Sequence, residues 1–135
     1  MRARNLASHV RVGLVAGDGG ALLWPLLVGA NRAKEYLSLG ELVDGKTAEK
    51  VGLVNHCVPA AQVMAKAREL ADRMAALPTL AVLWTKVSMN KVLQQHCNLV
   101  METSTAYEMM SMVSADHREA ALVIAEKRKP RFTGR

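Results

Sequence analysis

The hydrophobic pattern divides the chain into a mixed first part and a strongly periodic second part. In the second part apolar residues recur every three or four positions, which is the repeat of an amphipathic helix. This pattern predicts four helices, over residues 60–77, 79–96, 98–113 and 116–128. Their expected core-facing residues are Val63, Ala67, Leu70, Met74, Leu77, Leu80, Leu83, Val87, Leu93, Leu99, Tyr107, Met110 and Val113.

The first part contains two short runs that are typical of strands. Residues 10–15 and 53–58 are rich in valine and leucine, and each run is bounded by a residue type that favours turns. A glycine turn over residues 17–20 follows the first run. Residues 21–28 are almost wholly apolar and carry no charge, so we expect this segment to be buried.

Two shorter helices are predicted between these runs. The first covers residues 32–39, with Asn31 as its N-cap and Gly40 as its end. The second covers residues 48–51, with Thr47 as its N-cap. The chain is therefore expected to be mostly α-helical, with one or two short strands.

Composition limits the class of protein and its partners. The chain has 135 residues, half of them hydrophobic, which is enough for one globular domain with its own core. The net charge of +6 suits a phosphate-bearing ligand, although ordinary solubility explains it equally well. No nucleic-acid motif and no apolar run of about 20 residues is present, so neither nucleic acid nor a membrane is expected as a partner.

The two cysteines and the polar residues give few further signals. Cys57 and Cys97 lack the spacing of metal ligands, so we expect no metal site and free thiols in a reducing, cytoplasmic compartment. His9 lies just before the glycine turn, where an imidazole could transfer protons or serve a structural role. Asp116 and Glu119 have the spacing of a capping box at the start of the last helix.

Two other segments leave alternatives open. Residues 40–47 match the G-x-x-x-x-G-K-[ST] pattern of a phosphate-binding loop. Glu41 and Asp44 would place negative charge beside the phosphates, and Gly52 ends the following helix early, so a simple connection between helices is favoured. The basic residues 127–131 either complement the dipole of the last helix or form an anion site.

Four segments, in the right order, resemble those of one family. Residues 9–20 (HVRVGLVAGDGG) resemble the P-E-x-x-x-G-x-x-P-G-x-G-G segment of the enoyl-CoA hydratase/isomerase (crotonase) superfamily. Residues 40–54 are similar to that family's T-G-[DE]-x-[IL]-x-A-x-E-A-x-x-x-G-L-V stretch, and residues 59–67 to the start of its first C-terminal helix. Residues 116–132 resemble its D-x-x-E-[GA]-x-x-A-F-x-E-K-R-x-P-x-F terminus.

The resemblance implies an α/β, crotonase-like fold of which this chain is the C-terminal half, without the N-terminal sheet core. Residues 1–58 would belong to the core, and residues 59–135 would form a helical oligomerisation region. The implied activity is hydration or isomerisation of an acyl-CoA thioester in fatty acid metabolism, through an enolate-type intermediate. CoA would be part of the substrate, with no separate cofactor. A homotrimer, a hexamer or a separate N-terminal half is implied as partner; the alternative is a non-catalytic oligomerisation module.

The resemblance also implies roles for individual residues. His9 stands where hydratases carry their second catalytic glutamate, and Ser8 stands in place of the preceding proline. Gly17 corresponds to the glycine that helps to hold the reacting water. Asp18 occupies a normally neutral position, and we expect it to cap the next helix, with pairing to His9 as the alternative. The implied CoA-binding residues are Lys127, Arg128 and Phe132.

Overall fold

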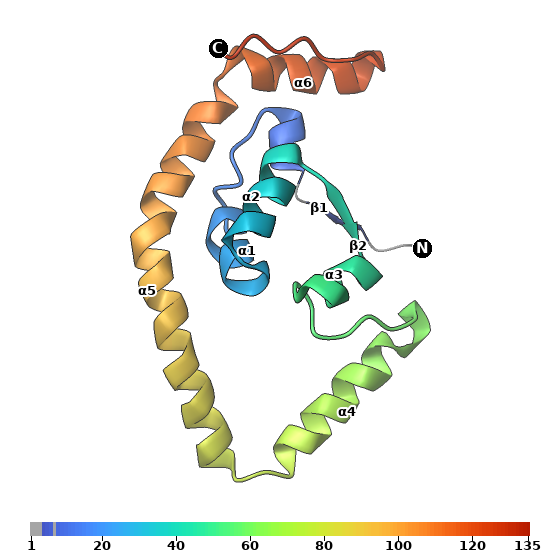
Figure 1. Cartoon of the computed structure of the whole chain (residues 1–135), viewed down its shortest axis with the longest axis vertical. Helices are drawn as coiled ribbons and strands as arrows, with labels where there is room; N and C mark the ends of the chain where they lie inside the picture. The colour runs from blue at the N-terminus through green and yellow to red at the C-terminus, as the bar shows by residue number, and fades with distance from the viewer. Residues whose placement is uncertain (1–3, 7) are drawn as a thin grey trace.

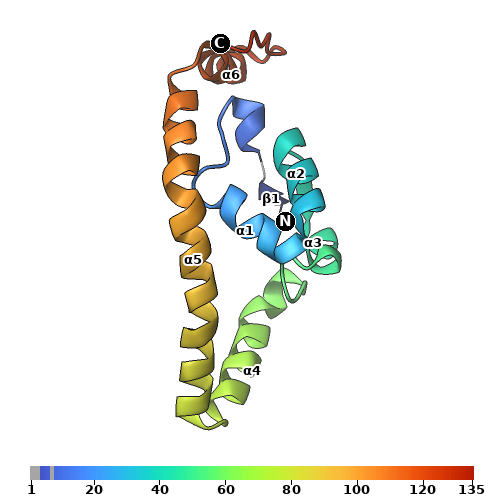
Figure 2. The same ribbon diagram turned by 60° about the vertical axis from the view of Figure 1, so that its left-hand side comes forward.

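The computed structural model describes residues 4–6 and 8–135. Figures 1 and 2 show a chain built mainly of helices, two of them long and projecting. The 3₁₀ helices are labelled η. In chain order the elements are β1 (Arg4–Leu6), η1 (His9–Val12), α1 (Gly20–Val28), α2 (Ala30–Leu39), β2 (Leu42–Asp44), α3 (Gly45–Val51), η2 (Ala60–Gln62), α4 (Val63–Ala75), α5 (Thr79–Met112) and α6 (Ala115–Glu126).

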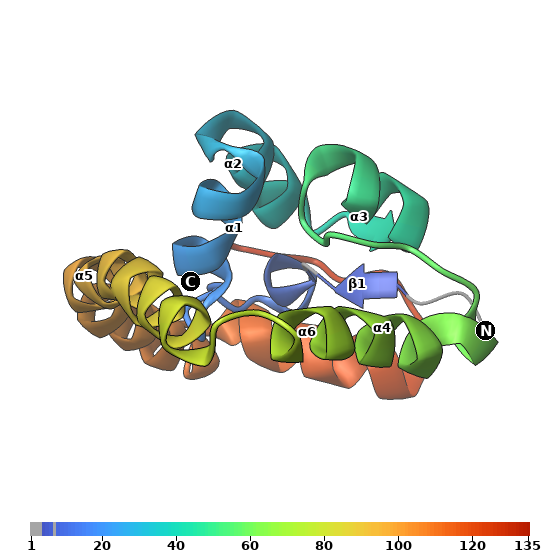
Figure 3. The same cartoon turned by 90° about the horizontal axis from the view of Figure 1, so that it is seen from below.

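The elements form a small inner unit and an open outer frame. Helices α4, α5 and α6 make the frame, and α1, α2, α3 and the two strands lie within it (Figure 1). Seen from below, α2 and α3 lie in one layer and α4, α5 and α6 in another (Figure 3). The frame meets the inner unit mainly where α5 packs on α1 and where α6 packs on η1.

The predicted helical character is confirmed, but both strand positions are wrong. Most of the segment 10–15 forms η1 and a loop, because Gly13 adopts a left-handed φ of 68° and its N–H bonds to the carbonyl of His9. The segment 53–58 forms bends and irregular chain. The two strands are instead β1 and β2, which pair antiparallel, with Val43 at 2% exposure as the largest fully buried side chain.

The predicted ends of the two shorter helices are correct, and their predicted caps are wrong. Gly40 and Gly52 end α2 and α3 in left-handed conformations, as glycine allows. Helix α2 begins directly after Gly29, so Asn31 lies inside it. Helix α3 is capped by Asp44, whose Oδ1 accepts a hydrogen bond from the Thr47 N–H at 2.8 Å. Thr47 is therefore in the first turn.

The second half contains one helix where two were expected. Helix α5 runs unbroken for 34 residues, because no glycine or proline interrupts residues 79–112. The predicted core-facing residues along it are exposed: Leu80 is 58% exposed, Leu99 77%, and Val113, just past its end, 72%. In the described part of the chain, the buried apolar residues are Ala16, Leu22, Val28, Ala33, Val43, Ala48, Ala120 and Val123.

This core is smaller than the sequence led us to expect. Helix α1 is buried only at Leu22 and Val28, whereas Leu23, Leu26 and Leu27 are exposed. A large apolar surface along α4 and α5 is also left uncovered. None of the helices in the described part combines the length and apolar character needed to cross a lipid bilayer.

Candidate active site

The candidate site begins with an imidazole and a carboxylate from opposite ends of one short segment. His9 opens η1, and its Nε2 lies 3.3 Å from the Oδ2 of Asp18 in the glycine turn. The residue at the N-cap of α1 is Gly19, with no side-chain cap, so the expectation that Asp18 caps this helix is wrong. The alternative, pairing with His9, is confirmed. The pairing fixes one ring nitrogen of His9 against an acceptor.

A third polar side chain reaches the same place from α5. One side-chain N or O atom from each of His9, Asp18 and Glu108 lies within 4.8 Å of the others. Glu108 is buried, at 9% exposure. Among the described residues, its carboxylate makes no hydrogen bond or ion pair, and the His9 Nδ1 is buried without a partner. In the part of the chain that the structure describes, the site therefore holds one fully buried polar atom without a partner, the His9 Nδ1, next to a glutamate that is itself buried.

Helix α5 also fixes the backbone that leads into the turn. Ser104 Oγ donates to the Gly17 carbonyl at 2.9 Å, and Ser111 Oγ accepts from the Val15 N–H at 3.1 Å. From α6, His117 Nδ1 lies 2.7 Å from the Val12 carbonyl. These contacts join parts of the chain that are 87 to 105 residues apart in sequence.

The sequence analysis did not find these residues of α5. Ser104, Glu108 and Ser111 are spaced by four and then three positions, so they share one helix face. The polar residues at these three positions were the available signal. The apolar periodicity of the same segment predicted a core face instead.

We expect Gly17→Ala to destabilise this site strongly. A Cβ on Gly17 would lie 2.4 Å from the backbone oxygen of Ser104 and 2.7 Å from the Cβ of Glu108, so α5 must move away. Overpacking of this kind costs about 1–3 kcal/mol. Thermal unfolding followed by circular dichroism measures the loss.

Gly20→Ala is the matched control for that substitution. Its added Cβ would meet only the side chains of Ala16 and Leu37, at 3.0 and 3.4 Å. Gly20 is also helical, where alanine is favoured over glycine by roughly 0.5–1 kcal/mol. Equal unfolding temperatures for the two variants would show that Gly17 does not require the close approach.

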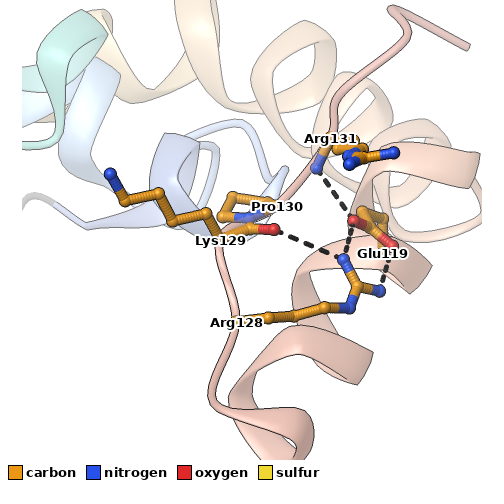
Figure 4. Close-up of a pocket in the computed structure, with 5 residues that line it drawn as sticks. All are labelled: Glu119, Arg128, Lys129, Pro130 and Arg131. Carbon is orange, nitrogen blue, oxygen red and sulfur yellow. Dashed lines mark hydrogen bonds and ion pairs between the residues drawn. The ribbon is translucent and has the colours of Figure 1, made fainter.

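The basic tail forms a second polar centre on α6. The Arg128 guanidinium donates to Glu119 Oε2 at 2.8 Å and also to Glu126, and the Arg131 N–H donates to Glu119 at 2.8 Å. Figure 4 shows these donors converging on the Glu119 carboxylate beside Lys129 and Pro130. The hydrogen bonds from Arg128 lower the pKa of Glu119 to about 2, and the same bonds raise the pKa of Arg128.

The start of α6 differs from the predicted capping box. Ser114 Oγ caps this helix by accepting from the His117 N–H at 3.0 Å. Asp116 instead accepts from the N–H groups of Thr133 and Gly134 at 2.7 and 2.9 Å. The hydrogen bond from the Thr133 N–H is the main cause of the lowered pKa of Asp116. Both acids thus hold the tail against the helix.

The predicted CoA-binding residues lie on this tail. Lys127 ends α6 with a left-handed φ of 53°, Arg128 is held in the ion pairs above, and Phe132 is half exposed. Within the described residues, no hydrogen bond or ion pair links them to His9 or Gly17. The structure therefore brings His9 and Gly17 into one centre and places the three tail residues in another.

The phosphate-loop alternative is excluded by the geometry. Residues 42–44 of the motif form β2, and the Asp44 carboxylate occupies the start of α3, where a phosphate would have to bind. Helix α3 has only seven residues. A simple connection between helices is the correct interpretation.

Comparison with known proteins places this geometry in a family. The enoyl-CoA hydratase/isomerase family model matches residues 2–135. An enoyl-CoA isomerase/hydratase of Mycosarcoma maydis is 33% identical over 129 residues, covering 94% of this chain and 46% of that protein. The crotonyl-CoA hydratase of Syntrophomonas wolfei is 27% identical, and the match covers 92% of this chain and 48% of that protein.

Solved structures agree with the sequence match. An enoyl-CoA hydratase/isomerase from Pseudoalteromonas atlantica superposes with a TM-score of 0.87 at 27% identity, covering 97% of this chain and 53% of that one. A carnitinyl-CoA dehydratase from Mycobacterium avium superposes with a TM-score of 0.88 at 25% identity, and the match covers 97% of this chain and 52% of that one.

This chain belongs to the enoyl-CoA hydratase/isomerase family. Its helices and short strands correspond to part of the crotonase-like fold. The chain spans about half the length of these relatives. The family predicted from the four sequence motifs is confirmed.

Proposed function

We propose that this chain supplies the proton-transfer side of an acyl-CoA site, and that it acts on an enoyl-CoA thioester through an enolate-type intermediate. The observation that carries the proposal is the His9 imidazole held by Asp18 at 3.3 Å beside the Gly17 turn. The backbone N–H of Gly17 is also available at this site to bind a ligand. Within the described residues, the N–H of Gly17 makes no hydrogen bond, whereas its carbonyl is bound by Ser104.

These groups suit the hydration of a carbon–carbon double bond. A water molecule bound to the Gly17 N–H would lie next to His9, which removes one of its protons as the oxygen adds to C3 of the thioester. The electron pair of the double bond moves to C2 and the thioester oxygen, which gives the enolate. The protonated His9 then gives that proton to C2, so that one water molecule has been added across the double bond and His9 is neutral again. In isomerisation His9 would instead move a proton between carbons of the acyl chain.

The tail is proposed to bind the CoA portion of the substrate. Lys127 and Arg128 supply positive charge, and Phe132 supplies an apolar ring that is half exposed. To reach a phosphate, Arg128 must exchange its bonds with Glu119 and Glu126 for bonds to the ligand. A guanidinium forms bidentate pairs with either partner, so the exchange keeps its geometry.

The supporting partners are proposals of the same kind. A trimer, a hexamer or a separate protein with the sheet-bearing half of the fold would cover the apolar faces of α4 and α5. Cys57 and Cys97 are free thiols, which is consistent with a reducing compartment such as the cytoplasm.

Calorimetric titration with an acyl-CoA tests the proposal. We expect saturable binding, and weaker binding of the same acyl group on a short thioester that lacks the nucleotide, because the tail then has no phosphate to contact. The titration is repeated after addition of the sheet-bearing half of a relative. The absence of heat from acyl-CoA under both conditions would contradict the proposal.

A second candidate is a non-catalytic assembly module. The observation that favours it is the apolar surface of α4 and α5, where large side chains are exposed on both helices. Such a surface marks an interaction site. An assay of turnover separates the two candidates. A chain that only assembles has no turnover and does not need the His9 imidazole.

A further inference from the structure

We infer that His9, Asp18 and Glu108 form a binding site for a divalent metal ion of the Zn²⁺ type. One nitrogen or oxygen atom of each residue lies within 4.8 Å of the others. They come from three different elements, η1, the glycine turn and α5. The inference goes beyond the acyl-CoA proposal and concerns a second state of the same residues: a metal on the His9 ring occupies a nitrogen lone pair that a base needs, so His9 acts as the base in the metal-free chain. Metal binding requires none of the tail residues and no substrate.

The spacing of the three side chains suits such an ion. Zn²⁺ holds nitrogen and carboxylate oxygen at about 2.0–2.2 Å, so neighbouring ligand atoms around it lie roughly 3.3–3.6 Å apart. The His9 Nε2 and the Asp18 Oδ2 are already 3.3 Å apart. The Glu108 oxygen lies within 4.8 Å of both atoms, so it has to move by at most about 1.5 Å to reach coordination distance. The Asp18 side chain is 61% exposed and is free to adjust.

Unused bonding capacity at the site is a second, independent observation. Glu108 is 91% buried, yet its carboxylate has no hydrogen-bond or ion-pair partner in the part of the chain that the structure describes. Burying an unpaired carboxylate is costly unless a cation or donor compensates it. A metal bound to the His9 Nε2, the Asp18 Oδ2 and Glu108 supplies the partner that the Glu108 carboxylate lacks.

Charge leads to the same conclusion. Asp18 and Glu108 bring two negative charges together, and no described lysine or arginine forms an ion pair with either of them. A divalent cation neutralises the pair, as it does in protein sites built from carboxylates and imidazole. This holds although the chain as a whole carries a net charge of +6.

Three protein ligands leave a coordination position open. In zinc enzymes a water molecule takes that position, and the metal makes it acidic enough to act as a nucleophile near neutral pH. Gly17 lies directly against Glu108, since an added Cβ would be 2.9 Å from the Glu108 Oε2. A metal-bound water would therefore lie beside the proposed position of the reacting water.

Metal titration of the whole chain, without any CoA compound, tests the inference. We expect one equivalent of Zn²⁺ to bind by calorimetry, and one equivalent of Co²⁺ to give the visible absorption of a protein-bound ion. Glu108→Gln, His9→Ala and Asp18→Asn are each expected to weaken Zn²⁺ binding about tenfold or more, which is the lower bound for loss of a supporting group around a metal.

The controls separate this site from other ligands on the chain. Cys57→Ser, Cys97→Ser and His56→Ala remove other soft ligands and should leave Zn²⁺ binding unchanged. Asp18 is exposed, so Asp18→Asn reports on the site even if Glu108→Gln fails to fold. The absence of one-equivalent binding, or binding that Asp18→Asn does not weaken, overturns the inference. Either result leaves the acyl-CoA proposal intact, because the titration with acyl-CoA that tests that proposal uses no metal.

Discussion

His9→Ala is expected to lower kcat for an enoyl-CoA thioester by about 10²–10⁴-fold, the range that a positioned general acid or base contributes. The imidazole is the group that transfers the proton in the proposed site, and Asp18 orients it at 3.3 Å. Alanine removes the proton carrier without adding bulk to the 3₁₀ helix. KM should change little, because the proposed CoA contacts lie on the tail. Steady-state hydration assays measure both constants.

Two controls accompany this measurement. His56→Ala removes an exposed histidine outside the site and should keep full turnover. Asp18→Asn retains His9 but weakens its orientation, so a smaller loss of kcat is expected than for His9→Ala. Wild-type turnover that survives in His9→Ala would contradict the assignment of His9 as the proton-transfer group.

Trp84→Glu is expected to dissociate the chain from the assembly partners proposed above. Trp84 is 62% exposed near the start of α5, on an apolar surface that also carries Leu80 and Leu83. Truncating an aromatic anchor in an interface commonly costs about 2 kcal/mol or more, which is roughly a 30-fold weakening of association, and a buried charge adds to it. Light scattering combined with size-exclusion chromatography measures the mass of the wild type and the variant.

Lys86→Glu provides the matched control, since Lys86 is exposed two positions after Trp84, on the other side of the same helix, and the substitution also introduces a glutamate. It should leave the assembly state unchanged. If the wild-type chain elutes as a stable monomer of 14.7 kDa, the apolar surface is not an association surface.

The parts of the fold that the sequence predicted are those set by local chemistry. Gly40 and Gly52 end helices because their left-handed backbone is a property of glycine itself. The helical second half follows from apolar periodicity. The strands were misplaced because β2 is only three residues long and pairs with the distant β1, which no local pattern records.

The site was predicted in part, for a similar reason. His9 and Gly17 were found through the family motif, and their neighbours on α5 were not. Glu108 lies on a helix whose apolar periodicity predicted a core face rather than a site. It contacts Gly17 only in the folded chain, because the two residues are far apart in sequence. The periodic residues of α5 were assigned to a core because periodicity shows which face is apolar. It does not show whether this chain or another one covers that face.

The length of α5 has a mechanical consequence. At about 1.5 Å per residue its 34 residues span about 51 Å, so one rigid rod carries Trp84 near one end and Glu108 near the other. In the proposed assembly, a partner that holds the Trp84 end of this helix would also limit the movement of the Glu108 end beside His9. The specific activity expected from the proposed function should therefore rise with protein concentration, because association would fix the helix that carries Glu108.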